Sequence, residues 1–279
     1  RHKQCAFNLY AAAAMQRALA PMCRAFGDHD RADAVDRFGR ALQAATIRKF
    51  WSAERGLFVN NLPWLDEEKS LRMCDRSLAT AVLFDQCPDG QTAAAVKALA
   101  ECPPEMGFSY PCNAGWRLWA LGKAGRADVI VSDFRKRWAT MLSVRENKTL
   151  QEDWTAQHDS GQQWSHCAVV PLYLAYHGLM RLRPLEPGFK RYELRPQPAD
   201  LQELELTAFT VRGPIRMRSR GAVGDREIAF ELPAEAQGEL VLSEAEDPGL
   251  PAASGPAPAG CRRFSLPAGR RTHLTLKHT

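Results

Sequence analysis

Pro184-Leu185-Glu186-Pro187-Gly188 divides the chain into two parts that differ in the periodicity of their apolar residues. Before this segment apolar residues recur at helical spacing, whereas after it they alternate in short runs between Gly and Pro turns. Alternation of this kind is typical of antiparallel strands that bury one face. The sequence therefore predicts a helical domain over residues 1–186 and a β-sandwich domain over residues 187–279.

The helical part is predicted to consist of helix–turn–helix units. An apolar stripe through Phe7, Tyr10 and Met22 indicates a first helix that ends near Gly27, and a stripe through Phe38 indicates a second helix. The segments Phe26–Asp33 and Leu121–Asp128 resemble each other, as if one unit were reused. Further helices are expected at residues 72–84, 91–99, 113–121, 128–142 and 165–180.

The connections between these units are long and rich in aromatic and polar residues, notably at residues 51–69, 103–112 and 146–163. Loops of this length usually carry function. A toroid of paired helices with the long loops gathered at one mouth fits this pattern better than a solenoid. In the second part, strands are expected at residues 192–196, 204–209, 215–219, 226–232, 239–242, 261–266 and 272–276.

Composition excludes several classes of protein. The 279 residues include 37 basic and 32 acidic side chains, and without a basic cluster this mild excess does not predict nucleic-acid binding. No apolar run is long enough for a membrane-spanning helix. Because the first residues lead straight into a helix, the chain is expected to begin inside a structure, which leaves a cytoplasmic, periplasmic or secreted location open.

The eight cysteines predict neither a zinc site nor a disulfide scaffold. They form no C-x-x-C pair, and most lie in helical apolar stretches where a thiol behaves as a small hydrophobe. Cys102 and Cys112 flank one loop and are the only pair for which a bond is considered. We expect no metal ion and no cofactor.

Candidate catalytic residues gather in Thr149–Trp154 and in the following segment Asp159–His166. Sugar hydrolysis needs a carboxylate that activates water and aromatic faces that hold the sugar ring. This stretch offers Glu152 and Asp153 with Trp154 and Trp164. The same acids could also be solvated loop residues, and His166 could be a hydrogen-bonded core residue of the last helix.

This stretch resembles the end of the catalytic domain of bacterial α-L-rhamnosidases. Those enzymes carry a Thr-x-x-Glu-x-Trp type segment, a Ser-His helix start, and a Pro-x-x-Pro-Gly-Phe passage into a Leu-x-Pro strand. Here the matching segments are Thr149–Trp154, Ser165-His166, Pro184–Phe189 and Leu194–Pro196. The family fold implies part of an (α/α)6 toroid of helical hairpins, followed by an antiparallel β-sandwich. The implied activity is inverting hydrolysis of terminal α-L-rhamnose from a carbohydrate.

The resemblance assigns roles to individual residues. Glu152 resembles the catalytic base, and His166 resembles a histidine that contacts the rhamnose ring. The remaining candidates for lining the pocket are Trp154, Trp164, Tyr110 and Trp116, with Asn60, Asn61 and Trp64 in another mouth loop.

The chain departs from the family pattern in two places. Gln151 stands where many members have Trp just before the base. Nothing in the chain matches the acidic, Arg-containing segment that carries the general acid, and the predicted hairpins are fewer than a closed toroid contains. The hypothesis is that the first half of the toroid, with the acid, lies outside this chain and packs against it, because the apolar inner faces of its helices would otherwise be bare.

Two other interpretations stay open. The first is another (α/α)6 glycosidase or a polysaccharide lyase, which an unsaturated product would reveal. The second is a non-catalytic carbohydrate-binding relative that kept the fold and lost the acid. It predicts affinity for sugar without turnover.

Overall fold

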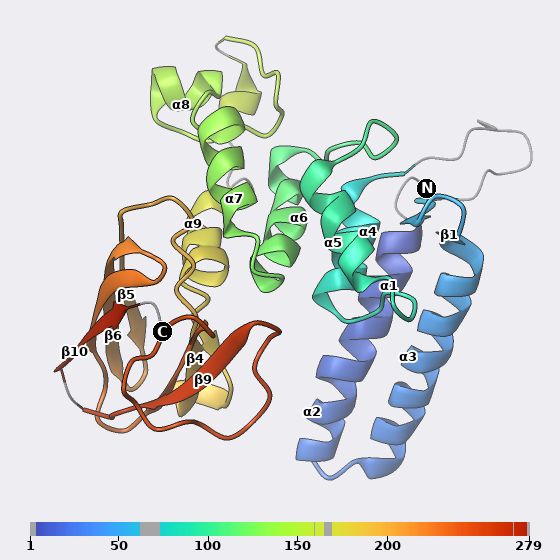
Figure 1. Cartoon of the computed structure of the whole chain (residues 1–279). Coiled ribbons are helices and arrows are strands. Elements are labelled where there is room, and N and C mark those ends of the chain that lie inside the picture. The colour runs from blue at the N-terminus through green and yellow to red at the C-terminus, as the bar shows by residue number, and fades with distance from the viewer. Residues whose placement is uncertain (1–3, 62–72, 159, 165–168, 270, 278–279) are drawn as a thin grey trace, which may run out of the picture. The chain divides into compact units, whose positions relative to one another are not determined.

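The computed structural model describes residues 4–61, 73–158, 160–164, 169–269 and 271–277 (Figure 1). Its contacts divide the chain into two compact units. The first, here called the helical unit, comprises Arg1–Ala124 and Met141–Val170, and the second, here called the sandwich unit, comprises Gly125–Thr140 and Pro171–Thr279. The expected domain limits, 1–186 and 187–279, stay a prediction.

The helical unit begins with a long antiparallel hairpin (Figure 1). Its first arm runs through α1 (Gln4–Ala14), the π-turn η1 (Met15–Leu19) and α2 (Ala20–Ala25). The π-helical turn ends two residues before Pro21, which has no N–H to donate to the helical ladder. The second arm is α3 (His29–Phe50), where Asp28 is the N-cap and accepts a hydrogen bond from the Arg31 amide.

Small residues form the contact between the two arms. A Cβ atom built at Gly39 of α3 would lie 2.9 Å from Gln16 Cγ and 3.2 Å from the Ala12 carbonyl oxygen, so the backbones approach closely here. Leu9 and Phe50 of this hairpin are buried, but several other large apolar side chains face outward: Phe7 is 72% exposed and Phe38 is 59% exposed. The hairpin therefore leaves a large part of its apolar surface uncovered in the described structure.

Two short strands, β1 (Trp51–Ser52) and β2 (Leu57–Phe58), follow the hairpin. The remaining elements of the helical unit are α4 (Asp75–Leu83), α5 (Thr92–Glu101), α6 (Pro111–Lys123), α8 (Leu142–Asn147) and the 3₁₀ turn η3 (Gly161–Gln163). Helix α4 packs against both α1 and α6. Basic side chains of α6 bind the C-terminal carbonyls of its neighbours: Lys123 donates to Leu83, and Arg117 donates to Leu99.

The sandwich unit contains α7 (Ala127–Asp133), the π-turn η2 (Phe134–Trp138), most of α9 (Val170–Leu174) and the π-turn η5 (Ala175–Leu179). Its strands are β3 (Arg183–Pro184), β4 (Arg191–Leu194), β5 (Glu203–Thr210), β6 (Gly213–Ala222), β7 (Asp225–Glu231), β8 (Gln237–Ser243), β9 (Cys261–Leu266) and β10 (Arg271–Lys277). They form two four-stranded sheets, in the orders β10-β7-β6-β5 and β3-β4-β8-β9.

Pairing is antiparallel throughout both sheets except between β4 and β8, which run parallel. The predicted alternation is visible in β6, where Ile215 and Met217 are buried while Arg216 is exposed. The expected fold class, helical hairpins followed by a β-sandwich, is confirmed. No disulfide joins the cysteines that the structure describes, Cys102 and Cys112 included.

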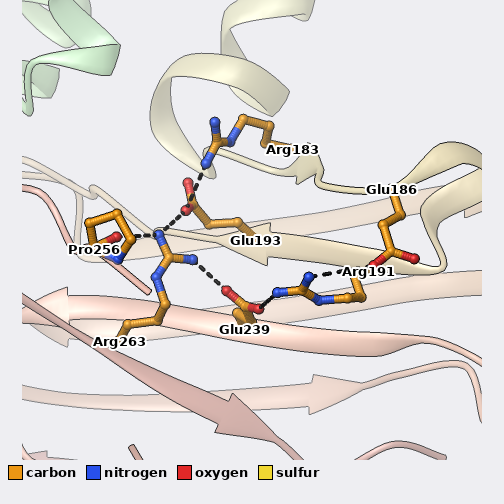
Figure 2. Close-up of polar contacts among 7 residues, drawn as sticks. All are labelled: Arg183, Glu186, Arg191, Glu193, Glu239, Pro256 and Arg263. Atoms are coloured by element: carbon orange, nitrogen blue, oxygen red, sulfur yellow. Dashed lines mark hydrogen bonds and ion pairs between the residues drawn. The ribbon is translucent and has the colours of Figure 1, made fainter. Parts of the chain in front are cut away.

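Ion pairs join the strands and the two sheets. In the second sheet, Arg263 donates to both Glu193 and Glu239, and Glu239 also accepts from Arg191 (Figure 2). Between the sheets, Arg226 of β7 and Glu246, which follows β8, form a bidentate pair with both contacts at 2.8 Å. Their side chains are 2% and 0% exposed, so this pair lies inside the sandwich.

Candidate active site

The loop that follows α8 is held from within by buried amide side chains. The Gln151 side chain is buried, accepts from the Ser143 amide at 3.0 Å and donates to the Asp153 carbonyl at 2.6 Å. Thr149 donates to the carbonyl of the buried Gln163 at 2.8 Å. These bonds fix the backbone on both sides of residue 152. Gln151 therefore holds the loop in place from its buried side.

Glu152 itself lies on the outside of this framework. Its amide donates to the Gln162 carbonyl at 2.9 Å, while its side chain is exposed. Among the residues that the structure describes, no hydrogen bond or ion pair occupies the carboxylate. The neighbouring bonds thus present an unpaired carboxylate on a fixed backbone, which is what a base acting on water requires.

Trp154 connects this loop to a second one. Its Nε1–H donates to the Ser109 carbonyl at 2.9 Å. The next residue, Tyr110, precedes α6 and is 57% exposed. The structure therefore brings together two of the predicted pocket residues, Trp154 and Tyr110, from loops that are far apart in the sequence.

Trp116 has a different environment. Its ring packs edge-on against Tyr10 at 5.2 Å between centroids, and the Arg76 guanidinium lies over it at 5.7 Å. Phe84 and Trp119 complete this aromatic cluster. The cluster is formed by α1, α4 and α6 and their ends, so in the described part of the chain Trp116 is a packing residue between helices.

The other predicted site residues divide into described and undescribed ones. Trp164 directly follows η3 and is 57% exposed. Asn60 is buried and accepts from the Ser77 hydroxyl at 3.0 Å, and Asn61 next to it is buried as well. His166 and Trp64 lie outside the described residues.

Sequence reasoning missed the buried residues that organise these loops. Asp75, at the start of α4, accepts from the Ser109 hydroxyl at 2.5 Å and from the Ser109 amide at 3.2 Å. Gln163 accepts from Asn147 at 3.3 Å. Asp75 lies inside the predicted helix 72–84 and Gln163 inside the candidate segment Asp159–His166, but nothing in the sequence marked either residue as a structural contact.

The thiols near these loops do not suit nucleophilic chemistry. Burial raises the pKa of Cys5 to about 12, although a hydrogen bond with Ser77 opposes this change. Burial also raises the pKa of Cys74, and the charge of Asp75 adds to that effect. A thiol is reactive only as the thiolate, so these cysteines are structural.

No group of His, Cys, Asp and Glu suited to a metal ion occurs in the described part of the chain. None of the helices described here has both the length and the hydropathy of a membrane span.

Comparison with known proteins gives a family match for one segment of the chain and structural matches for most of its length. Residues 181–253 match the family described as the bacterial alpha-L-rhamnosidase C-terminal domain. No curated protein matches the chain. The GH78 family rhamnosidase of Bacillus sp. GL1 is similar in structure, with a TM-score of 0.72 and 21% sequence identity. The similarity covers 85% of this chain and 26% of that protein.

Two further solved structures resemble the chain over nearly all of its length. The Streptomyces avermitilis alpha-L-rhamnosidase complexed with L-rhamnose has a TM-score of 0.70 at 17% identity, covering 96% of this chain and 26% of that protein. The alpha-L-rhamnosidase of Dictyoglomus thermophilum has a TM-score of 0.72 at 12% identity, covering 96% of this chain and 31% of that protein. The chain thus spans less than a third of each of these three proteins.

The comparisons establish the fold of the chain and a family match for one segment of it. The solved structures that share this fold, helical hairpins followed by a β-sandwich, are rhamnosidases, and at 12–21% identity they establish the fold alone. Residues 181–253 carry the C-terminal domain of the bacterial α-L-rhamnosidases, and the resemblance to that family is confirmed.

Proposed function

We propose that this chain carries the general-base side of an α-L-rhamnosidase active site, with Glu152 as the base. In inverting hydrolysis, one carboxylate removes a proton from a water molecule that attacks the anomeric carbon. A carboxylic acid on the opposite face of the sugar protonates the leaving oxygen. The substrate of this proposal is a glycoside with a terminal α-L-rhamnose.

The observation that carries the proposal is the contrast between Glu152 and its neighbours. Gln151 is 1% exposed and bonded at both ends of its amide, whereas the Glu152 side chain is exposed and has no partner in the described chain. A solvated loop acid needs no such framework. A base does, because proton transfer requires its carboxylate to stay within hydrogen-bond reach of one water position.

Aromatic side chains would hold the sugar beside this base. Trp154 is anchored through its indole nitrogen, which leaves its ring fixed, and Tyr110 and Trp164 are exposed. Rhamnose has an apolar methyl group, and aromatic faces bind such apolar sugar surfaces. We assign the contact with rhamnose hydroxyl groups to His166, on the basis of the family resemblance. Trp116 is the least suited of the predicted lining residues, since it packs between helices.

The general acid is proposed to lie on the remainder of the toroid. This chain matches only 26–31% of the three solved rhamnosidases, so more than two thirds of each of those proteins has no counterpart in it. The α1–α3 hairpin supports this proposal, because it exposes large apolar side chains that a soluble protein rarely leaves bare. The side chains concerned are Phe7, Leu19, Met22, Phe26 and Phe38. We propose that the remainder of the toroid packs on this surface.

The test is hydrolysis of an aryl α-L-rhamnoside by the full-length protein, with wild type and Glu152→Gln compared side by side. Glutamine keeps the size of the side chain and removes its basicity. We expect kcat to fall by about 10²–10⁴-fold, which is the contribution of a positioned general base. Thermal unfolding should be unchanged, because the carboxylate makes no bond in the described structure.

Glu101→Gln is the matched control. Glu101 is an exposed glutamate at the end of α5, with Lys97 at 3.9 Å as its ion-pair partner. This variant should keep wild-type kcat. Turnover by Glu152→Gln at the wild-type rate would remove Glu152 from the chemistry. Wild-type protein that binds rhamnose and does not turn over would favour the carbohydrate-binding relative, and an unsaturated product would favour a lyase.

A further inference from the structure

Asp75 is a buried acid that is linked through hydrogen bonds of Ser109 to the loop of the proposed base. It is the first residue of α4 and is 1% exposed. The Ser109 hydroxyl donates to its Oδ1 at 2.5 Å, and the Ser109 amide donates to its Oδ2 at 3.2 Å. Both carboxylate oxygens therefore bind the same residue, once through its backbone and once through its side chain.

The backbone around Asp75 strengthens this connection. The Asp75 amide donates to the Gly107 carbonyl at 3.2 Å, and Cys74 forms a parallel β-bridge with Gly107. The segment before Ser109 thus runs alongside the start of α4. The start of α4 thus holds this segment at Gly107 through the backbone and at Ser109 through the Asp75 carboxylate, so Ser109 cannot move without breaking several bonds.

The Ser109 peptide in turn holds the loop of Glu152. Its carbonyl oxygen accepts the Trp154 indole N–H at 2.9 Å, and Trp154 lies two residues after Glu152. All of these residues belong to the helical unit. The chain of bonds runs from Asp75 through Ser109 to Trp154, and it joins the start of α4 to both loops that carry candidate pocket residues.

We propose that Asp75 is a positioning residue that acts through Ser109 and Trp154 to set the place of the Glu152 loop and of the Trp154 ring. This inference rests on the proposed function for its catalytic consequence, but the positioning itself does not. A charged acceptor suits this role, because hydrogen bonds to a buried carboxylate are shorter and stronger than those to a neutral amide. Asp75 does not touch the substrate in this account.

The experiment replaces Asp75 by Asn in the full chain and follows the Trp154 indole N–H by NMR. The signal is assigned from its loss in Trp154→Phe. Asparagine keeps the shape of the side chain but offers only one acceptor oxygen, so the Ser109 peptide loses one of its two carboxylate contacts. We expect hydrogen exchange at the Trp154 indole to accelerate at least tenfold. Exchange at the wild-type rate in a folded Asp75→Asn protein would overturn the proposal.

Kinetics of the double variant separate positioning from a general loss of stability. Asp75→Asn and Trp154→Phe should each lower kcat/KM on an aryl α-L-rhamnoside. If Asp75 acts through Trp154, the double variant should lose no more than the worse single variant. Losses that multiply would show independent effects and would contradict the proposal. If the wild-type protein has no rhamnosidase activity, the proposed function is wrong. Hydrogen exchange at the Trp154 indole still tests the positioning role of Asp75 in that case.

Two further variants control this experiment. Asp128→Asn removes another acid from the first turn of a helix, where Asp128 pairs with Arg126. It should leave both indole exchange and kcat/KM unchanged. Ser109→Ala removes only the hydroxyl donor, so indole exchange should accelerate as in Asp75→Asn, but by a smaller factor. This variant replaces Asp75→Asn in the experiment if Asp75→Asn does not fold. Unchanged indole exchange in Ser109→Ala would then overturn the proposal.

Discussion

The two units of this chain differ in how far their large apolar side chains are buried. The sandwich unit buries them between its sheets: Ile215, Phe230 and Leu240 are each no more than 1% exposed. The helical unit begins with a hairpin in which small residues make a close contact and several large apolar ones face outward, with Phe26 at 84% exposure. The sandwich thus buries its large apolar side chains within itself, whereas the first hairpin leaves several of them exposed.

Polar groups show the same difference. In the sandwich unit, buried charges meet partners from the same unit, as Arg226 does with Glu246. In the helical unit, the carboxylate of Glu152 has no partner in the described chain. An exposed carboxylate is solvated and costs nothing, so Glu152 stays available to act on water, as the proposed function requires. A large exposed apolar surface is unfavourable, and the proposed packing of a further part of the toroid would cover it.

The largest expected effect concerns the buried ion pair. Glu246→Gln leaves the Arg226 guanidinium uncompensated inside the sandwich, and breaking such a pair costs about 3–5 kcal/mol. We expect the sandwich unit to lose that much stability in urea unfolding followed by amide exchange. Glu231→Gln, which breaks the exposed pair with Arg216, should cost about 0–1 kcal/mol. Equal losses in the two variants would contradict the buried assignment.

Truncation of an aromatic side chain in each unit sharpens the comparison. Phe230→Ala opens a cavity in the sandwich core and should cost about 3–5 kcal/mol. Phe38→Ala removes a ring that is 59% exposed on α3, and its effect should stay within about 0.5 kcal/mol. Chemical denaturation of both variants tests this difference. A large loss in Phe38→Ala would show that the first hairpin already buries this ring in the isolated chain.

The smallest expected effect is a dependence of the sandwich unit on pH. Burial acts to raise the pKa of Glu239, but hydrogen bonds from Arg191 and Arg263 outweigh it and hold that pKa below its usual range. A carboxyl with a lowered pKa in the folded state stabilises the fold above its unfolded pKa and loses this contribution as pH falls through the folded value.

Urea unfolding between neutral and acid pH should therefore show the sandwich unit weakening below the usual range of a glutamate. In Glu239→Gln this part of the acid dependence should be absent. An acid dependence equal to that of wild type would mean that Glu239 does not contribute to it.

Sequence reasoning predicted the sandwich more completely than the site. Strands such as β6 were predictable because alternation places Ile215 and Met217 on one face whatever the partner strand is. The parallel pairing of β4 with β8 was not, since it depends on contacts between distant segments. Helix α8 was missed, because a six-residue helix is too short to show periodicity.

Within the site, the sequence pointed to single residues but not to what holds them. Glu152 stood out through its motif. Asp75 and Ser109 did not, because they lie 34 residues apart and become neighbours only in the folded chain. In the sequence Gln151 was only a departure from the family pattern, whereas in the structure its buried amide bonds to the backbone of Ser143 and Asp153. Trp116 was proposed on residue type alone, and its position between helices could not be read from spacing.

The central claim is that Glu152 is a base that acts on water, and chemical rescue tests it most directly. In the full-length protein, Glu152→Ala should have almost no activity on an aryl α-L-rhamnoside. Sodium azide supplies a nucleophile that needs no base, so it should restore release of the aryl group and give a rhamnosyl azide of inverted configuration. Activity in Glu152→Ala without azide, or no rescue despite intact folding and rhamnose binding, would contradict the account.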